Sequence, residues 1–171
     1  GKPNFRTLNH SASFPMEIML ALGAITTGGV LKRFPGLRVG FLEGNCGWLP
    51  WWLDRLDDQW EKYGGGEAIQ LDALPSDYFK RQCFIGTDVD EALLRVVIDE
   101  IGDENIVMST DYPHADGPYP NGTQIFLELP GVSLESKRKI LWKNCLSLYG
   151  FDETSPSKSQ QGTEAKSNFC G

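Results

Sequence analysis

Two kinds of apolar pattern alternate along the chain. Short runs that are apolar at nearly every position are typical of strands buried on both faces, whereas apolar residues three or four positions apart are typical of amphipathic helices. The runs lie at 37–43, 83–87 and 105–111. The segments with helical spacing begin near Ser13, Trp48, Asp88 and Ser133. This alternation predicts parallel β-α-β units and therefore an α/β fold.

Each predicted helix carries signals at its ends. The first is expected to stop at the Pro-Gly pair 35–36, because proline cannot continue a helix. Asp88 is expected to be the N-cap of the third helix, and Gly102 to end it. The last helix is expected to begin at Ser133 and to end at Gly150. Its predicted inward side chains are Leu141, Cys145 and Leu148.

An aromatic stripe marks the second helix. Trp48, Trp52, Leu56 and Trp60 recur every four residues, so they share one helix face. Such a stripe usually belongs to the core or to a subunit interface, and less often lines a substrate pocket. The spacing alone leaves these alternatives open.

Acidic residues follow the predicted strands. Ligands of parallel α/β domains bind where the carboxyl ends of the strands meet. At these ends lie Glu43, Asp88 and Asp111, and His114 follows Asp111 by three residues. Asp111 and Glu43 are therefore the candidate catalytic residues. Three simpler interpretations stay open: Asp111 could cap its own loop, Asp88 a helix, and Glu43 could accept from the amides of a glycine turn.

The net charge of the chain limits the kinds of partner that can be expected. Its 171 residues contain 16 Lys and Arg against 23 Asp and Glu, a formal net charge of −7. A surplus of acid argues against nucleic acid or an anionic membrane as the main partner, because both require clustered cations. No apolar run approaches the roughly 18–20 residues that span a bilayer. We therefore expect neither nucleic acid nor a membrane as a partner.

Composition also suggests the domain organisation and the compartment. The four cysteines (Cys46, Cys83, Cys145 and Cys170) form no C-x-x-C pair, which favours reduced thiols in a cytoplasmic protein. Residues 152–171 are polar and poor in apolar side chains. We expect one domain over 1–151 and a disordered tail over 152–171.

Several strings, in the same order along the chain, resemble one family. They are 29–39, Phe41-Leu-Glu-Gly44, Gly47-Trp-Leu-Pro50, Arg55-Leu-Asp57, Leu74-Pro-Ser-Asp-Tyr-Phe79, Ser109-Thr-Asp-Tyr-Pro-His114, Lys143-Asn144 and Leu148-Tyr-Gly150. Together they resemble the amidohydrolase-related group of the amidohydrolase superfamily, in the branch of aminocarboxymuconate-semialdehyde decarboxylase. The resemblance covers about residues 10–151.

The resemblance implies a metal-dependent TIM-barrel enzyme. One divalent metal, usually zinc, would bind at the strand mouths, and the enzyme would hydrolyse a small molecule or remove CO₂ from an organic acid. The resemblance implies that Asp111 is a metal ligand and that Glu43 takes the place of an acid/base histidine. Arg55 matches an arginine that reaches a substrate carboxylate across a dimer interface, which makes a homodimer possible. Trp48 and His114 are expected to contact the substrate.

The chain accounts for only part of such a barrel. Its three predicted strands correspond to about strands six to eight, and the family's other metal ligands have no match here. His10 lies too close to the first helix to replace them. One carboxylate does not hold catalytic zinc, so the metal is expected in the complete protein, whereas this chain alone could bind none. The alternative is an inactive remnant that acts as an oligomerising or interaction module. Four apolar side chains are expected to point inward without partners: Val39, Phe41, Phe84 and Val107.

Overall fold

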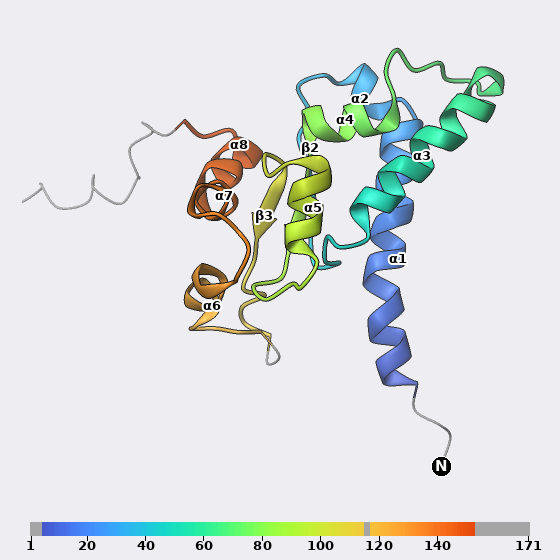
Figure 1. Ribbon diagram of the computed structural model, residues 1–171. Helices are drawn as coiled ribbons and strands as arrows, with labels where there is room; N and C mark the ends of the chain where they lie inside the picture. Colours follow the sequence, from blue (N-terminus) through green and yellow to red (C-terminus); the bar gives the residue numbers. More distant parts are fainter. Residues whose placement is uncertain (1–4, 115–116, 153–171) are drawn as a thin grey trace, which may run out of the picture.

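Three parallel strands form the centre of the computed structural model, which describes residues 5–114 and 117–152. They are β1 (Val39–Phe41), β2 (Cys83–Thr87) and β3 (Ile106–Met108). Their order in the sheet is β1-β2-β3, the same as their order along the chain (Figure 1). The three predicted strands are thus confirmed, the first and the last in shortened form. Consecutive parallel strands in sequential order are the arrangement found in a TIM barrel.

The register of the strands separates two sheet faces. Phe41 pairs with Ile85 and Ile85 with Ile106, and these three side chains belong to the main hydrophobic core. Gly40 pairs with Phe84, and Gly86 with Val107, so these four residues lie on the opposite face. The prediction that Val39, Phe41, Phe84 and Val107 share one inward face is therefore wrong. A strand that is apolar throughout shows no alternation from which its facing could be read.

Eight α-helices accompany the sheet in the described part of the chain. They are α1 (Arg6–Thr27), α2 (Val30–Arg33), α3 (Leu49–Tyr63), α4 (Pro75–Gln82), α5 (Leu94–Ile101), α6 (Gly122–Glu128), α7 (Leu134–Arg138) and α8 (Asn144–Tyr149). Figure 1 shows α5 in front of the sheet, α7 and α8 on the side of β3, and α1 beside α3. None of the described helices is long and apolar enough to cross a membrane.

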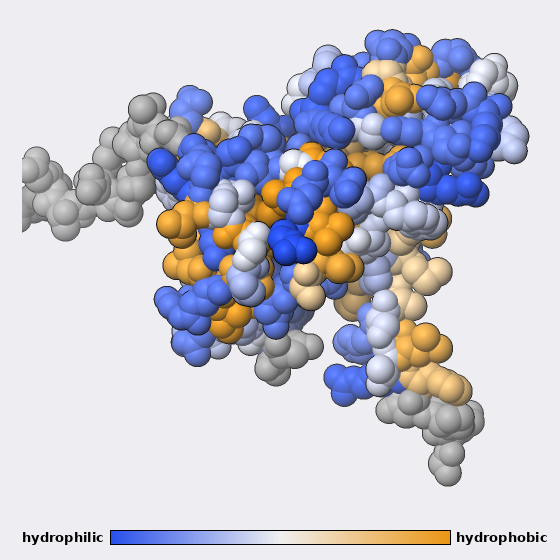
Figure 2. All heavy atoms as spheres, in the orientation of Figure 1, coloured by the Kyte–Doolittle hydropathy of each residue, from blue (hydrophilic) through white to orange (hydrophobic). Residues whose placement is uncertain are grey.

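The first helix begins earlier than the sequence predicts. Helix α1 starts at Arg6 and contains Pro15, whereas Ser13 was the predicted start. Its N-terminal half projects beyond the other elements in Figure 1, and Figure 2 shows apolar side chains along it. Leu8 and Phe14, for example, are 64% and 46% exposed. Only its C-terminal half is anchored in the core, through Leu22.

The last helical segment begins and ends as predicted but turns differently. Ser133 caps α7 by accepting a hydrogen bond from the amide of Ser136, and the segment ends at Gly150, whose φ is +72°. Between α7 and α8 the chain makes a wider, π-helical turn (η2, Lys139–Lys143). Ile140 and Asn144 are buried here, as are Ser136 and Lys137 of α7. Leu141, Cys145 and Leu148, predicted to face inward, are only half-buried.

Two helices were not expected from the sequence. Helix α4 places Tyr78 and Phe79 in the core, and α6 lies inside the Pro- and Gly-rich segment that follows the third strand, in which no helix was predicted from the sequence. Phe126 of α6 is fully buried. Of the tail predicted over 152–171, all but Asp152 lies outside the described residues.

Candidate active site at the carboxyl ends of the strands

A cavity of about 520 Å³ opens where the carboxyl ends of the three strands meet. The residues after β1, β2 and β3 form one side of its lining, and the N-terminal half of α1 contributes the rest. The lining comprises Arg6, His10, Ser11, Phe14, Pro15, Glu43, Asn45, Gly86, Thr87, Asp88, Ser109, Asp111 and His114. The structure thus brings together Glu43, Asp111 and His114, which the sequence singled out.

The backbone is strained at this cavity. Among the described residues, three that are not glycine have a positive φ: Glu43 (+66°), Asn45 (+57°) and Asp111 (+53°). All three line the cavity. A side chain in this region costs on the order of 1 kcal/mol or more, and such residues cluster at functional sites. The strain therefore supports a functional role for the cavity.

Asp111 is paired with the nearby histidine. Its Oδ2 lies 2.8 Å from Nδ1 of His114, and the two side chains are 40% and 62% exposed. The backbone amide of Asp111 also donates a hydrogen bond to the hydroxyl of Ser109 in the same loop, at 3.2 Å. The pair is thus held at the mouth of the cavity, with the imidazole oriented by the carboxylate.

The sequence suggested that Asp88 caps the following helix, but in the structure it lines the cavity instead. Helix α5 begins only at Leu94, with Leu93 at the N-cap position. The carboxylate of Asp88 instead accepts a hydrogen bond from Nδ2 of Asn45, at 2.6 Å. Burial raises the pKa of Asp88, and the negative charge of Glu91 nearby raises it further, while the Asn45 amide opposes the shift. This bond joins the loop after β1 to the loop after β2.

Glu91 is the residue of this region that sequence reasoning missed. Its carboxylate accepts from the amides of Cys46 (2.8 Å) and Gly47 (2.6 Å) and from the hydroxyl of Thr87 (2.9 Å). It also raises the pKa of the Cys46 thiol, which burial already holds far above its usual range. A glutamate within an acidic turn gives no periodic or motif signal, so only its contacts reveal it.

Two predicted substrate contacts do not line the cavity. The indole Nε1 of Trp48 donates to the carbonyl of Gly44, at 2.7 Å, and the ring packs against the core. Arg55 is exposed on α3, where a guanidinium nitrogen lies 3.7 Å from Asp58. A role for Arg55 across a dimer interface stays a prediction. His10, which the sequence placed just before the first helix, lies within α1 and lines the cavity.

The residues present do not make a complete metal site. Among the described residues, His, Cys, Asp and Glu side chains form no group of three or more that could hold a metal ion. Asp111 and His114 supply two potential ligand side chains, whereas a catalytic zinc usually has three from the protein. Further ligands would have to come from outside the described part of this chain.

The sequential parallel strands and the acidic cavity at their carboxyl ends define an α/β protein of the kind that includes the α/β barrels. The comparison with family models gives the family itself: the model described as "Amidohydrolase" matches residues 10–151. The chain belongs to this amidohydrolase family, which confirms the resemblance seen in its sequence motifs.

Two curated relatives are similar over most of the chain. Both are called 2-amino-3-carboxymuconate-6-semialdehyde decarboxylase. The protein from Dictyostelium discoideum is 27% identical over 138 residues, which are 81% of this chain and 38% of the relative. The protein from Caenorhabditis elegans is 28% identical over 142 residues, which are 81% of this chain and 34% of the relative. The chain thus spans little more than a third of these relatives.

Solved structures agree in fold. The 5-carboxyvanillate decarboxylase of Sphingomonas paucimobilis is 28% identical, with a TM-score of 0.64 over 76% of this chain and 38% of that one. An amidohydrolase from Mycobacterium avium subsp. paratuberculosis, 21% identical, reaches a TM-score of 0.70 over 83% of this chain and 35% of its own. A dihydroxybenzoic acid decarboxylase from Polaromonas, also 21% identical, contains manganese and an inhibitor; its TM-score is 0.62 over 77% of this chain and 39% of its own.

Proposed function

We propose that this chain is the C-terminal part of an amidohydrolase-family barrel, about strands six to eight, and that the complete protein is a metal-dependent carboxy-lyase acting on a small organic acid. One observation carries the proposal: Glu43, Asp88 and Asp111, each placed just after a different parallel strand, line one cavity with His114. Enzymes with barrel folds place their reactive groups at this edge of the sheet.

The lining of the cavity suits a carboxylated substrate. Arg6 and His10, which α1 contributes to the lining, are side chains that can bind a carboxylate by charge-assisted hydrogen bonds. The cavity volume of about 520 Å³ lies within the range of small-molecule sites. Several relatives and neighbours are named decarboxylases of small organic acids, which favours decarboxylation over hydrolysis.

The roles of the site residues follow from their positions. Asp111, oriented by its contact with His114, is the ligand this chain contributes to a divalent metal in the complete protein. Glu43 stands after β1 and can accept or deliver a proton at the bound substrate. Zinc is the metal that the family resemblance implies. Manganese is the metal bound in a neighbouring structure, and it prefers oxygen ligands such as Asp111.

The test uses the full-length protein, loaded separately with Zn²⁺ and Mn²⁺. We expect about one bound metal per chain and CO₂ release from at least one of three acids: 5-carboxyvanillate, 2,6-dihydroxybenzoate or 2-amino-3-carboxymuconate-6-semialdehyde. Asp111→Ala should remove most of the bound metal and turnover, whereas Asp99→Ala, at an exposed acid of α5, should leave both unchanged. Unchanged metal content and turnover in Asp111→Ala would refute the assignment.

The alternative is a protein that does not turn over and serves as an interaction module. It predicts no stoichiometric metal, no CO₂ release and no hydrolysis of small amides or esters, together with sedimentation that depends on concentration. Turnover by the full-length protein would exclude this alternative.

A further inference from the structure

We propose that Glu91 is the positioning residue of the cavity: its carboxylate fastens the turn after β1 to the loop after β2 and thereby fixes Glu43 and Asn45. Its activity readout rests on the proposed function, whereas the contacts themselves do not. Glu91 does not line the cavity, so it acts through the residues that do.

The carboxylate joins two separate loops. Oε1 accepts from the amides of Cys46 (2.8 Å) and Gly47 (2.6 Å), which lie between β1 and α3. Oε2 accepts from the hydroxyl of Thr87, at 2.9 Å, and lies 3.3 Å from the Cys46 sulfur. Thr87 is the last residue of β2 and itself lines the cavity. One side chain therefore satisfies donors from both strand ends.

The turn is shaped to receive this carboxylate. A Cβ added at Gly47 would lie 3.2 Å from Oε1 of Glu91 and 3.0 Å from Cβ of Leu93, so a side chain there would crowd the contact. The two donor amides lie just before α3, whose first helical residue is Leu49. Amides at such a position need acceptors from outside the helix, and an anion there is favoured.

The same turn contains two of the strained residues. Glu43 and Asn45, both with positive φ, flank Gly44, and the held amides of Cys46 and Gly47 follow directly. The side chain of Asn45 then reaches across to Asp88. Without the acceptor at Glu91, the amides of Cys46 and Gly47 lose their partner, and only the bonds of Asn45 to Asp88 and of Trp48 to the Gly44 carbonyl still hold the turn. The backbone can then relax toward negative φ, which would move Glu43 from its place in the cavity.

The experiment compares Glu91→Ala and Glu91→Gln with Glu100→Ala, a matched control at an exposed position of α5, in the full-length protein. Hydrogen exchange of the peptide covering 43–48 reports the turn, and kcat and KM for CO₂ release report the site. Both are measured with and without sodium formate, which can occupy the place of the missing carboxylate.

In Glu91→Ala we expect hydrogen exchange of the turn to become about tenfold faster or more and kcat to fall about tenfold or more, with KM within about threefold of the parent. The reason is that misplacement of a reacting group by about 1 Å can lower the rate about 100-fold. Formate should restore part of both, and Glu91→Gln, which keeps one acceptor, should be intermediate. Glu100→Ala should match the parent.

The proposal is overturned if kcat and exchange of the turn stay unchanged in Glu91→Ala, or if formate restores neither. If Glu91→Ala fails to fold, Glu91→Gln decides by the same measurements: a parent-like kcat and exchange rate would overturn the proposal. If the parent releases no CO₂ from the three acids, the proposed function fails separately. Formate-dependent protection of the turn then still decides whether Glu91 holds it.

Discussion

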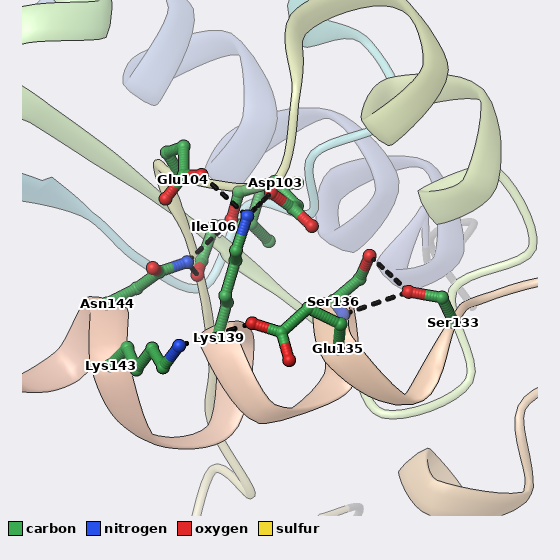
Figure 3. A network of polar contacts seen from close by, with 9 residues as sticks. All are labelled: Asp103, Glu104, Ile106, Ser133, Glu135, Ser136, Lys139, Lys143 and Asn144. Atoms are coloured by element: carbon green, nitrogen blue, oxygen red, sulfur yellow. Dashed lines mark hydrogen bonds and ion pairs between the residues drawn. The ribbon is translucent and has the colours of Figure 1, made fainter.

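Asn144 provides a test of how the last strand is anchored. It is 3% exposed, and its Nδ2 donates to the carbonyls of Asp103 and Ile106, both at 2.7 Å (Figure 3). Ile106 is the first residue of β3 and Asp103 lies in the connection before it, so one amide ties α8 to the strand that leads to Asp111. Asn144→Leu keeps the approximate volume of the side chain but removes both donors.

The expected loss follows from the two carbonyls left without a partner. Each costs about 1–3 kcal/mol, and the bond to Asp103 is only partly buried, so we expect the free energy of unfolding to fall by about 2–4 kcal/mol. Urea denaturation of the full-length protein, followed by tryptophan fluorescence, measures this change.

Ser147→Ala, at an exposed position of the same helix, is the control and should stay within about 0.5 kcal/mol of the parent. Asn144→Asp, which lacks the donor and adds a charge, should lose at least as much as Asn144→Leu. A loss below about 0.5 kcal/mol in Asn144→Leu would refute this account of the anchor.

Three further predictions concern charge and space. Burial raises the pKa of Asp88, so the folded protein binds a proton at this residue more tightly than the unfolded chain does. The stability of the fold therefore decreases as the pH rises through that pKa. In melting curves, Asp88→Asn should be more stable than the parent at about pH 8 and equally stable in acid. Burial acts to raise the pKa of Asp103, but the hydrogen bond from the Lys139 ammonium more than offsets it, so the pKa is lowered. The ionised carboxylate therefore stabilises the fold at neutral pH, and this stability is lost as the pH falls from about 4. Asp103→Asn should have a lower melting temperature than the parent at about pH 7, but not in acid. Gly47→Ala would place a methyl group 2.8 Å from Cδ1 of Leu93 and should cost about 1–3 kcal/mol of stability in urea denaturation.

The sequence predicted the parts of this fold that depend on local chemistry. Continuous apolar runs identified the strands, the tryptophan spacing identified α3, and Ser133 and Gly150 fixed the ends of the last helical segment. Glu43, Asp111 and His114 could be brought together because the carboxyl ends of parallel strands meet at one edge.

The errors have a common physical origin in tertiary contacts. Asp88 has the chemistry of a helix cap, but its bond to Asn45, 43 positions earlier, holds it in the cavity lining. The π-helical turn between α7 and α8 changes which side chains face the core, and no local sequence pattern predicts it. Glu91 likewise acts on residues more than 40 positions away.

The hydrogen bonds around the cavity connect two of the three loops at its edge and leave the third unconnected to them. Asn45 to Asp88 and Glu91 to the amides of Cys46 and Gly47 couple the first two loops, whereas the bond between Asp111 and His114 stays inside the third. A new sequence grafted beyond His114 would thus leave the coupled pair of loops intact. A change of sequence in the third loop therefore breaks none of the hydrogen bonds that join the first two.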